Sequence, residues 1–189
     1  HALLPATSRS VNYDPLKNFA AAGNVLWYST LLVCNPKLPF NDVAGYNNYA
    51  KANPGKLNVA TAGQGSGNHF SSEMLSQMAG IKVTHIPYKG NAPAIQDVIG
   101  GAADCIQLSE AKSYLDAGRV KALGTTGKVR DPRFPNLRTV EEQGLKGFDA
   151  PWWQGVFAPA GTAANVMAKL SAAVKKAAQE PSTKTIVFD

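Results

Sequence analysis

The chain has few of the features that identify a membrane protein, a metalloprotein or a redox enzyme. No apolar run approaches the roughly 20 residues that a membrane span needs, so the sequence predicts a soluble chain. Its 189 residues contain 3 histidines and 2 cysteines, and their spacing matches no metal or redox motif. We therefore expect no metal and no cofactor.

Charge is also sparse, because charged residues make up 17% of the chain. The net charge of +6 fits an anionic ligand, but the lysines and arginines are scattered and form no cluster longer than two. Nucleic-acid recognition generally needs a basic stripe, so no nucleic-acid partner is expected. Hydrophobic residues make up 44%, which predicts a globular chain with one good core or two small ones.

The two cysteines, Cys34 and Cys105, lie in apolar runs that resemble strands. Free cysteine is among the most buried residue types, and nothing in the spacing pairs these two. We therefore predict two buried thiols, from which no compartment follows.

From Asp42 onward the chain alternates helices with short strands. The pattern predicts helices over 42–52, 68–79, 92–99 and 111–117, and strands over 57–62, 82–86, 103–108 and 120–124. Because the strands are near-continuous apolar runs joined by helices, we expect a parallel sheet that is covered on both faces. Ligands of such sheets bind at the carboxyl ends of the strands.

The flanks of this region are less regular. Residues 27–35 form an apolar strand pattern without an evident partner, and residues 139–144 carry a capping box that predicts a short helix. A strand over 152–159 and a helix over 163–179 follow. Residues 1–10 lack the pattern of a signal peptide, and both ends look cut, so we expect a fragment of a larger protein.

Two groups of large apolar side chains are interpreted as packing. The first is a helical stripe that predicts one buried face: Phe70, Met74, Leu75 and Met78. The second consists of the three tryptophans, Trp27, Trp152 and Trp153.

A glycine-rich loop is the most informative motif. Gly63, Gly65 and Gly67 follow the strand 57–62 and precede the helix 68–79. Glycine permits positive φ and a close approach to the backbone, and a helix start offers unpaired N–H groups and the positive end of its dipole. This combination predicts an anion site.

Nucleotide sites fit this loop poorly. The dinucleotide motif G-x-G-x-x-G fails because Asn68 occupies the place of the third glycine, and no acidic residue follows the next strand. The Gly-Lys-Ser/Thr of a P-loop is absent.

A hydrolase is the alternative from another class. Ser66 would be the nucleophile, His69 or His85 the base, and Asp97 or Asp104 the orienting carboxylate. The elbow pattern G-x-S-x-G is not met, so an esterase of this kind remains the second hypothesis. A sensor domain that makes only protein contacts is a third.

The remaining hypothesis is that the loop binds an anion without covalent chemistry. The N–H groups of residues 65–68 and the Ser66 hydroxyl would bind a carboxylate through charge-assisted hydrogen bonds. Tyr88 and Lys89 follow the next strand and would supply a hydroxyl and a positive charge.

At this point the chain resembles a known family, the periplasmic solute receptors of tripartite tricarboxylate transporters (Bug family). The glycine loop together with Pro-Tyr-Lys-Gly is the specific part of the match. The matching segments keep the family's order and spacing over nearly the whole chain: Tyr13–Phe19, Leu32–Pro36, Asn53–Asn58, Ala60–His69, His85–Ala94, Ala117–Leu123, Thr139–Gly144 and Ala158–Thr162.

The resemblance implies an α/β fold of the type II periplasmic-binding-protein kind, with a parallel-sheet domain flanked by helices. Residues 29–151 would form the complete second, ligand-binding domain. Residues 1–28 and 152–189 would be incomplete parts of the first domain, so half of the ligand site would be missing.

The resemblance also implies a periplasmic monomer that is not an enzyme and that delivers a small organic acid to a membrane permease. Gln107–Glu110 departs from the family pattern, which leaves the ligand and the role of Gln107 open. The expected ligand-binding residues are those of the glycine loop and the two neighbouring strand ends: Thr61, Gly63, Gln64, Gly65, Ser66, Gly67, Asn68, His69, Tyr88, Lys89 and Gln107.

Overall fold

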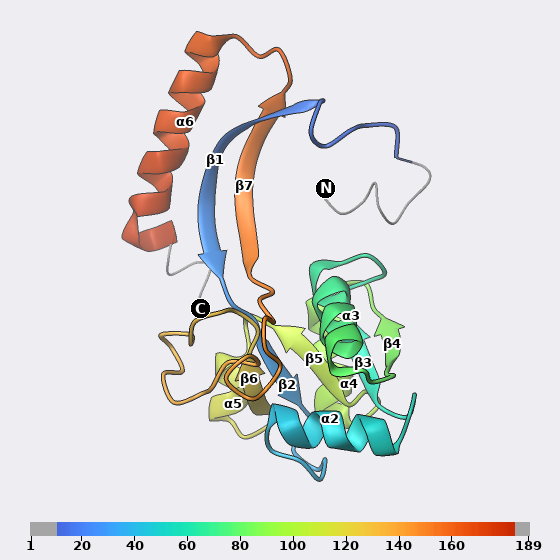
Figure 1. The fold of residues 1–189 in the computed structure, drawn as a ribbon. Coiled ribbons are helices and arrows are strands. Elements are labelled where there is room, and N and C mark those ends of the chain that lie inside the picture. Colours follow the sequence, from blue (N-terminus) through green and yellow to red (C-terminus); the bar gives the residue numbers. More distant parts are fainter. Residues whose placement is uncertain (1–10, 184–189) are drawn as a thin grey trace. The chain divides into compact units, whose positions relative to one another are not determined.

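The computed structural model describes residues 11–183, and the chain divides into two compact units. The core unit is Tyr28–Trp152, and the flanking unit combines His1–Trp27 with Trp153–Asp189. Figure 1 shows the strands and helices of both units. None of the helices in the described part of the chain has the length and apolar composition that a membrane crossing requires.

The core unit is built on a five-stranded sheet with the strand order β4-β3-β5-β2-β6. Strand β3 pairs in parallel with β4 and with β5, whereas β2 runs antiparallel to both β5 and β6. The bounds of the strands are β2 Leu31–Cys34, β3 Asn58–Thr61, β4 Thr84–Pro87, β5 Cys105–Leu108 and β6 Lys121–Thr125.

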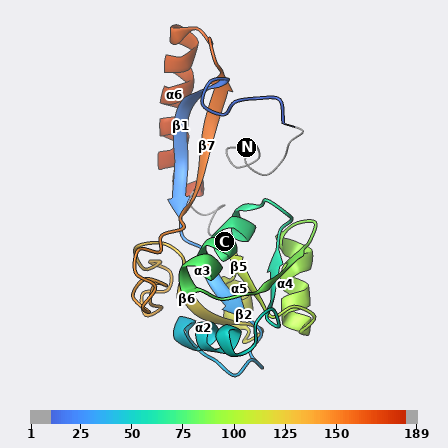
Figure 2. The same cartoon turned by 45° about the vertical axis from the view of Figure 1, so that its right-hand side comes forward.

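Helices cover both faces of this sheet, as expected. Alternate residues of β2 face opposite clusters: Leu32 packs with residues of α2 and α3, and Leu31 packs with residues of α4. Figure 2 shows α4 apart from α2 and α3. The bounds of the helices are α2 Val43–Ala52, α3 Gly67–Ala79, α4 Asn91–Gly100 and α5 Lys112–Asp116.

Three local expectations are wrong. The pattern at 27–35 is not one strand, because β2 begins only at Leu31 and then finds its partners far downstream. The capping box forms between Thr139 and Glu142, but the segment is a turn and not a helix. On α3, Met78 is 40% exposed, and small polar residues share the buried face with Leu75: Ser71, Ser72 and Ser76.

The prediction of two free thiols is also wrong, because Cys34 and Cys105 form a disulfide. The two residues lie directly opposite each other in the antiparallel pair β2–β5. They are separated by 71 positions in the sequence. Only the strand pairing brings them together, so their spacing contained no signal of the bond.

The disulfide closes a long loop, and we expect it to stabilise the core unit. Replacing both residues (Cys34→Ala with Cys105→Ala) should lower the free energy of unfolding by about 2–5 kcal/mol, measured by urea denaturation. A thiol reductant should destabilise the parent and leave the double variant unchanged. Equal urea midpoints for parent and double variant would contradict this expectation.

The flanking unit is a two-stranded sheet with one helix. Strand β1 (Phe19–Tyr28) pairs with β7 (Trp152–Pro159), and these strands continue from the core unit at Tyr28 and Trp152. Helix α6 spans Ala164–Gln179, and its Val174 packs close to Gly23 of β1. Large apolar side chains of this unit are exposed: Leu16, Phe19, Trp27, Trp153, Val156, Phe157 and Val166.

Candidate functional site

The glycine loop joins β3 to α3 and uses two of its glycines for their backbone freedom. Gly63 has φ of 132° and Gly65 has φ of 74°, in the region that residues with a side chain rarely adopt. Gly65 and Gly67 are half-buried and Gln64 is exposed. The loop therefore makes a tight turn at the carboxyl end of β3 and remains partly open to solvent.

The side chain of Asn68 ties this loop to its neighbours. Its Oδ1 accepts hydrogen bonds from the Ala62 N–H at 3.0 Å and from the Ser66 hydroxyl at 2.7 Å. Its Nδ2 donates to Asn91 Oδ1 at 3.2 Å and to the Gln107 carbonyl at 3.3 Å. Asn68 is 1% exposed, and these hydrogen bonds join the loops at the ends of β3, β4 and β5.

Three backbone N–H groups at the start of α3 lack a hydrogen-bond acceptor in the described part of the chain. The Gly65 N–H donates to His69 Nδ1 at 2.9 Å, and the Ser66 N–H donates to the Gly63 carbonyl at 3.1 Å. Among the described residues, no acceptor meets the N–H groups of Gly67, Asn68 and His69. These first-turn groups carry the positive end of the helix dipole and can bind an anion.

The Ser66 hydroxyl is engaged within the loop. It lies 2.6 Å from the Gly63 carbonyl and 2.7 Å from Asn68 Oδ1, so its single proton has two internal acceptors. The expectation that it would donate to a ligand therefore finds no support in this geometry.

The arrangement required for a serine hydrolase is not formed in the described part of the chain. His69 Nδ1 faces the Gly65 N–H and not Ser66. The two candidate orienting carboxylates are occupied elsewhere, Asp97 by the Tyr88 hydroxyl and Asp104 by the Asn58 N–H. Ser66 thus has no base positioned to accept its proton.

Tyr88 and Lys89 follow β4 and take different roles. The Tyr88 hydroxyl donates to Asp97 Oδ2 at 2.7 Å, so its proton is committed to α4. Burial, followed by the hydrogen bond to Asp97 and its charge, raises the pKa of Tyr88 to about 12. Lys89 is exposed and is left as the charged side chain at this strand end.

The raised pKa of Tyr88 should make the free energy of unfolding depend on pH in the alkaline range. Because the value rises from 10.0 to about 12 on folding, the stabilisation should be fully present below pH 10 and lost as the pH passes 12. The stability of the parent should therefore exceed that of Tyr88→Phe at neutral pH, and the difference should shrink across this window. Urea unfolding at a series of pH values measures it; a constant difference would refute the assignment.

Gln107 lies at the end of β5 and is not on an exposed rim. It is 1% exposed, and neither its side-chain oxygen nor its nitrogen has a hydrogen-bond partner among the described residues. Thr61 is also 1% exposed, and its carbonyl accepts the Tyr88 N–H at 2.9 Å. Both residues are therefore buried near the carboxyl ends of their strands, β3 and β5.

Trp152 is the site residue that sequence reasoning missed. A β-carbon at Gly67 would lie 2.8 Å from Cζ2 and 3.0 Å from Cη2 of the Trp152 ring, so the indole packs directly against the first residue of α3. The Tyr28 ring also lies near Trp152, with ring centroids 6.2 Å apart. Gly67 is therefore required by the tryptophan rather than by its own φ angle.

The contact between Gly67 and Trp152 can be tested by substitution. Alanine normally stabilises a helix relative to glycine by roughly 0.5–1 kcal/mol. Gly67→Ala should instead lower the free energy of unfolding by about 1–3 kcal/mol, because the methyl group forces the indole out of place. Urea unfolding measures the stability, and the native-state tryptophan emission should also change.

The matched control is Gly100→Ala at the end of α4. A β-carbon there meets no atom within 4 Å, so this variant should be at least as stable as the parent. If Gly67→Ala were as stable as Gly100→Ala, the proposed packing would be incorrect.

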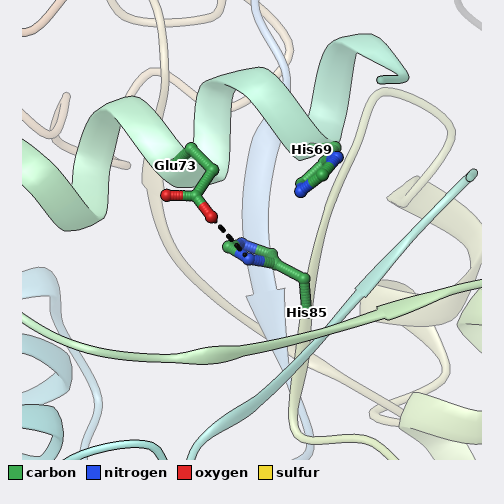
Figure 3. Close-up of side chains that lie close together, drawn as sticks. All are labelled: His69, Glu73 and His85. Atoms are coloured by element: carbon green, nitrogen blue, oxygen red, sulfur yellow. Dashed lines mark ion pairs between the residues drawn. The ribbon is translucent and has the colours of Figure 1, made fainter. Parts of the chain in front are cut away.

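His69 and His85 lie close together, on α3 and β4. Their ring centroids are 4.9 Å apart, and His85 Nδ1 lies 3.1 Å from Glu73 Oε1, as Figure 3 shows. Burial lowers the pKa of His85, against the opposing effect of Glu73. The spacing of the histidines in the sequence matches no metal motif, because His85 lies on a different element from His69 and Glu73.

Comparison with known proteins relates this chain to transport receptors. Residues 1–189 match the family model described as tripartite tricarboxylate transporter family receptor. A Cupriavidus necator protein, the "UPF0065 protein in gbd 5'region", is 36% identical over 180 residues, which cover 95% of this chain and 54% of that protein. The chain spans about half the length of the curated relatives it matches.

Solved structures agree with this match. MatC from Rhodopseudomonas palustris, solved with bound malate, is 33% identical to this chain with a TM-score of 0.85. The match covers 97% of this chain and 63% of the MatC chain. The periplasmic binding protein BugD is 30% identical with a TM-score of 0.86 and covers 97% and 62%. The expected α/β fold of the type II periplasmic-binding-protein kind is confirmed, with a mixed sheet in place of a fully parallel one.

Proposed function

Because the chain belongs to the receptor family of tripartite tricarboxylate transporters, we propose that it captures a small organic acid without transforming it. The ligand would be a dicarboxylate of the size of malate, which is bound by the related MatC. The acid would be passed to a membrane permease of the transporter.

The open first turn of α3 is the observation that carries this proposal. The N–H groups of Gly67, Asn68 and His69 have no acceptor in the described chain, and the helix dipole adds a favourable field at the same point. Hydrogen bonds from such donors to a carboxylate are charge-assisted and roughly twice as strong as neutral ones. The exposed Lys89 would attract the second carboxylate.

The other residues of the site would act by shaping it. Asn68 would hold the open turn in position through its hydrogen bonds to Ala62, Asn91 and Gln107. Trp152 would provide an apolar wall next to Gly67. Gly63, Gly65 and Thr61 would set the path of the loop, and Tyr88 would fix the neighbouring strand end.

A periplasmic location is part of the proposal. The disulfide between Cys34 and Cys105 supports it, because disulfides persist in oxidising compartments such as the bacterial periplasm. The related BugD is a periplasmic binding protein.

We further propose that residues 29–151 act as one ligand-binding domain, the second of the receptor, and that residues 1–28 and 152–189 belong to the first domain. The exposed apolar side chains of the flanking unit, such as Trp27 and Phe157, support this division, since exposed apolar surface of this kind commonly marks an interface. The whole receptor would act as a monomer that closes over its ligand.

Titration with malate, followed by NMR of the backbone amides, tests the site directly. The amide signals of Gly67, Asn68 and His69 should shift together and saturate, while the neutral diamide of malic acid should leave them in place because it lacks the charge. Lys89→Met should weaken malate binding, and the matched surface variant Lys56→Met should not. Shifts confined to other residues, or equal shifts with the diamide, would refute the proposal.

A further inference from the structure

A second group of chemically capable side chains lies one turn into α3, beyond the open amides. We propose that His69, Glu73 and His85 form a binding site for a divalent transition-metal ion of the zinc type. Each residue offers one ligand atom, and these atoms all lie within 4.8 Å of one another. Figure 3 shows the three side chains converging from the helix and from β4.

The secondary structure explains why these residues meet. His69 and Glu73 are four positions apart on α3, so their side chains lie on the same face of the helix. His85 is the second residue of β4, and the register of the parallel pair places it opposite Val59 of β3. The contact between His85 Nδ1 and Glu73 Oε1 shows that β4 brings His85 to that face of α3.

The distance between His85 and Glu73 already fits a metal. His85 Nδ1 and Glu73 Oε1 are 3.1 Å apart. Two ligands of one tetrahedral zinc ion, with bond lengths of about 2.0–2.2 Å, lie roughly 3.3–3.6 Å apart. An ion can therefore replace the proton that this pair shares with only a small movement of either side chain.

His85 is held in an orientation that suits a metal ligand. Its Nε2 lies 2.9 Å from the hydroxyl of Ser72, and Ser72 is 2% exposed. Metal-binding histidines generally use their second nitrogen in such a hydrogen bond, which fixes the ring and its tautomer. Ser72 thus directs Nδ1 of His85 toward Glu73.

His69 connects the metal site to the glycine loop. Its Nδ1 accepts the Gly65 N–H at 2.9 Å, so the neutral ring carries its proton on Nε2. One ring nitrogen of His69 points toward His85 in Figure 3. A metal on Nε2 would leave the ring neutral with its proton on Nδ1, and the Gly65 N–H would then lose its acceptor.

The ligand set favours borderline metals over hard ones. Two imidazoles and one carboxylate suit zinc and its neighbours in the first transition row, whereas Ca²⁺ and Mg²⁺ prefer sites built from oxygen atoms. Glu73 is 47% exposed and His85 is 12% exposed on their side chains, so solvent can reach the ion and complete its coordination. This site does not depend on the proposed capture of an organic acid.

Isothermal titration of the whole chain with zinc chloride tests the proposal. The parent should bind one zinc ion and should not bind Ca²⁺ under the same conditions. Glu73→Gln, His69→Gln and His85→Gln should each weaken zinc binding at least tenfold. Thermal unfolding in the presence of a chelator shows whether each variant is folded, and Glu73→Gln keeps a hydrogen-bonding group beside His85.

Two control variants separate this site from adventitious binding. Glu180→Gln makes the same chemical change at an exposed position at the end of α6, and His1→Gln removes the remaining histidine of the chain. Both should bind zinc like the parent. Zinc binding that survives Glu73→Gln, or that disappears in His1→Gln, would overturn the proposal, and so would a parent that binds no zinc.

The NMR signal of the Gly65 amide distinguishes this site from zinc binding elsewhere on the surface, which should leave that signal unchanged. Its NMR signal should shift on addition of zinc, because His69 Nδ1 no longer accepts its hydrogen bond. A Gly65 signal that stays in place while zinc binds would remove His69 from the ligand set.

Discussion

The hydrogen bonds of one buried amide, that of Asn68, hold the candidate site together. This side chain joins the end of β3, the start of α4 and the end of β5 through Ala62, Asn91 and Gln107. Each partner is a polar group that would otherwise lose hydrogen bonds on burial, which costs about 1–3 kcal/mol per unsatisfied group. These bonds fix the loop before α3, and the first N–H groups of the helix have no acceptor among the described residues.

The parts of the fold that the sequence predicted correctly depend on local interactions. Asp42 accepts the Gly45 N–H at the start of α2, and Gly80 ends α3 with φ of 62°. The glycine loop also lies where it was expected, at the end of a parallel strand. Such caps and turns are decided by neighbouring residues, so a single sequence is sufficient to recognise them.

The parts that the sequence missed depend on contacts between distant segments. Cys34 meets Cys105 only through the antiparallel pairing of β2, and Trp152 reaches Gly67 across most of the core unit's length in sequence. His85 meets Glu73 through the packing of two consecutive elements, α3 and β4. No periodicity or spacing within one segment contains such information, because tertiary packing decides it.

Helix α3 thus presents backbone donors at its start and imidazole and carboxylate groups one turn later, with His69 belonging to both sets. We propose that these backbone donors form the anion site. A crystal structure of the chain grown with malate tests it most directly. We expect a malate carboxylate within hydrogen-bond distance of the N–H groups of Gly67, Asn68 and His69. Malate bound elsewhere, with only water at this turn, would contradict the account.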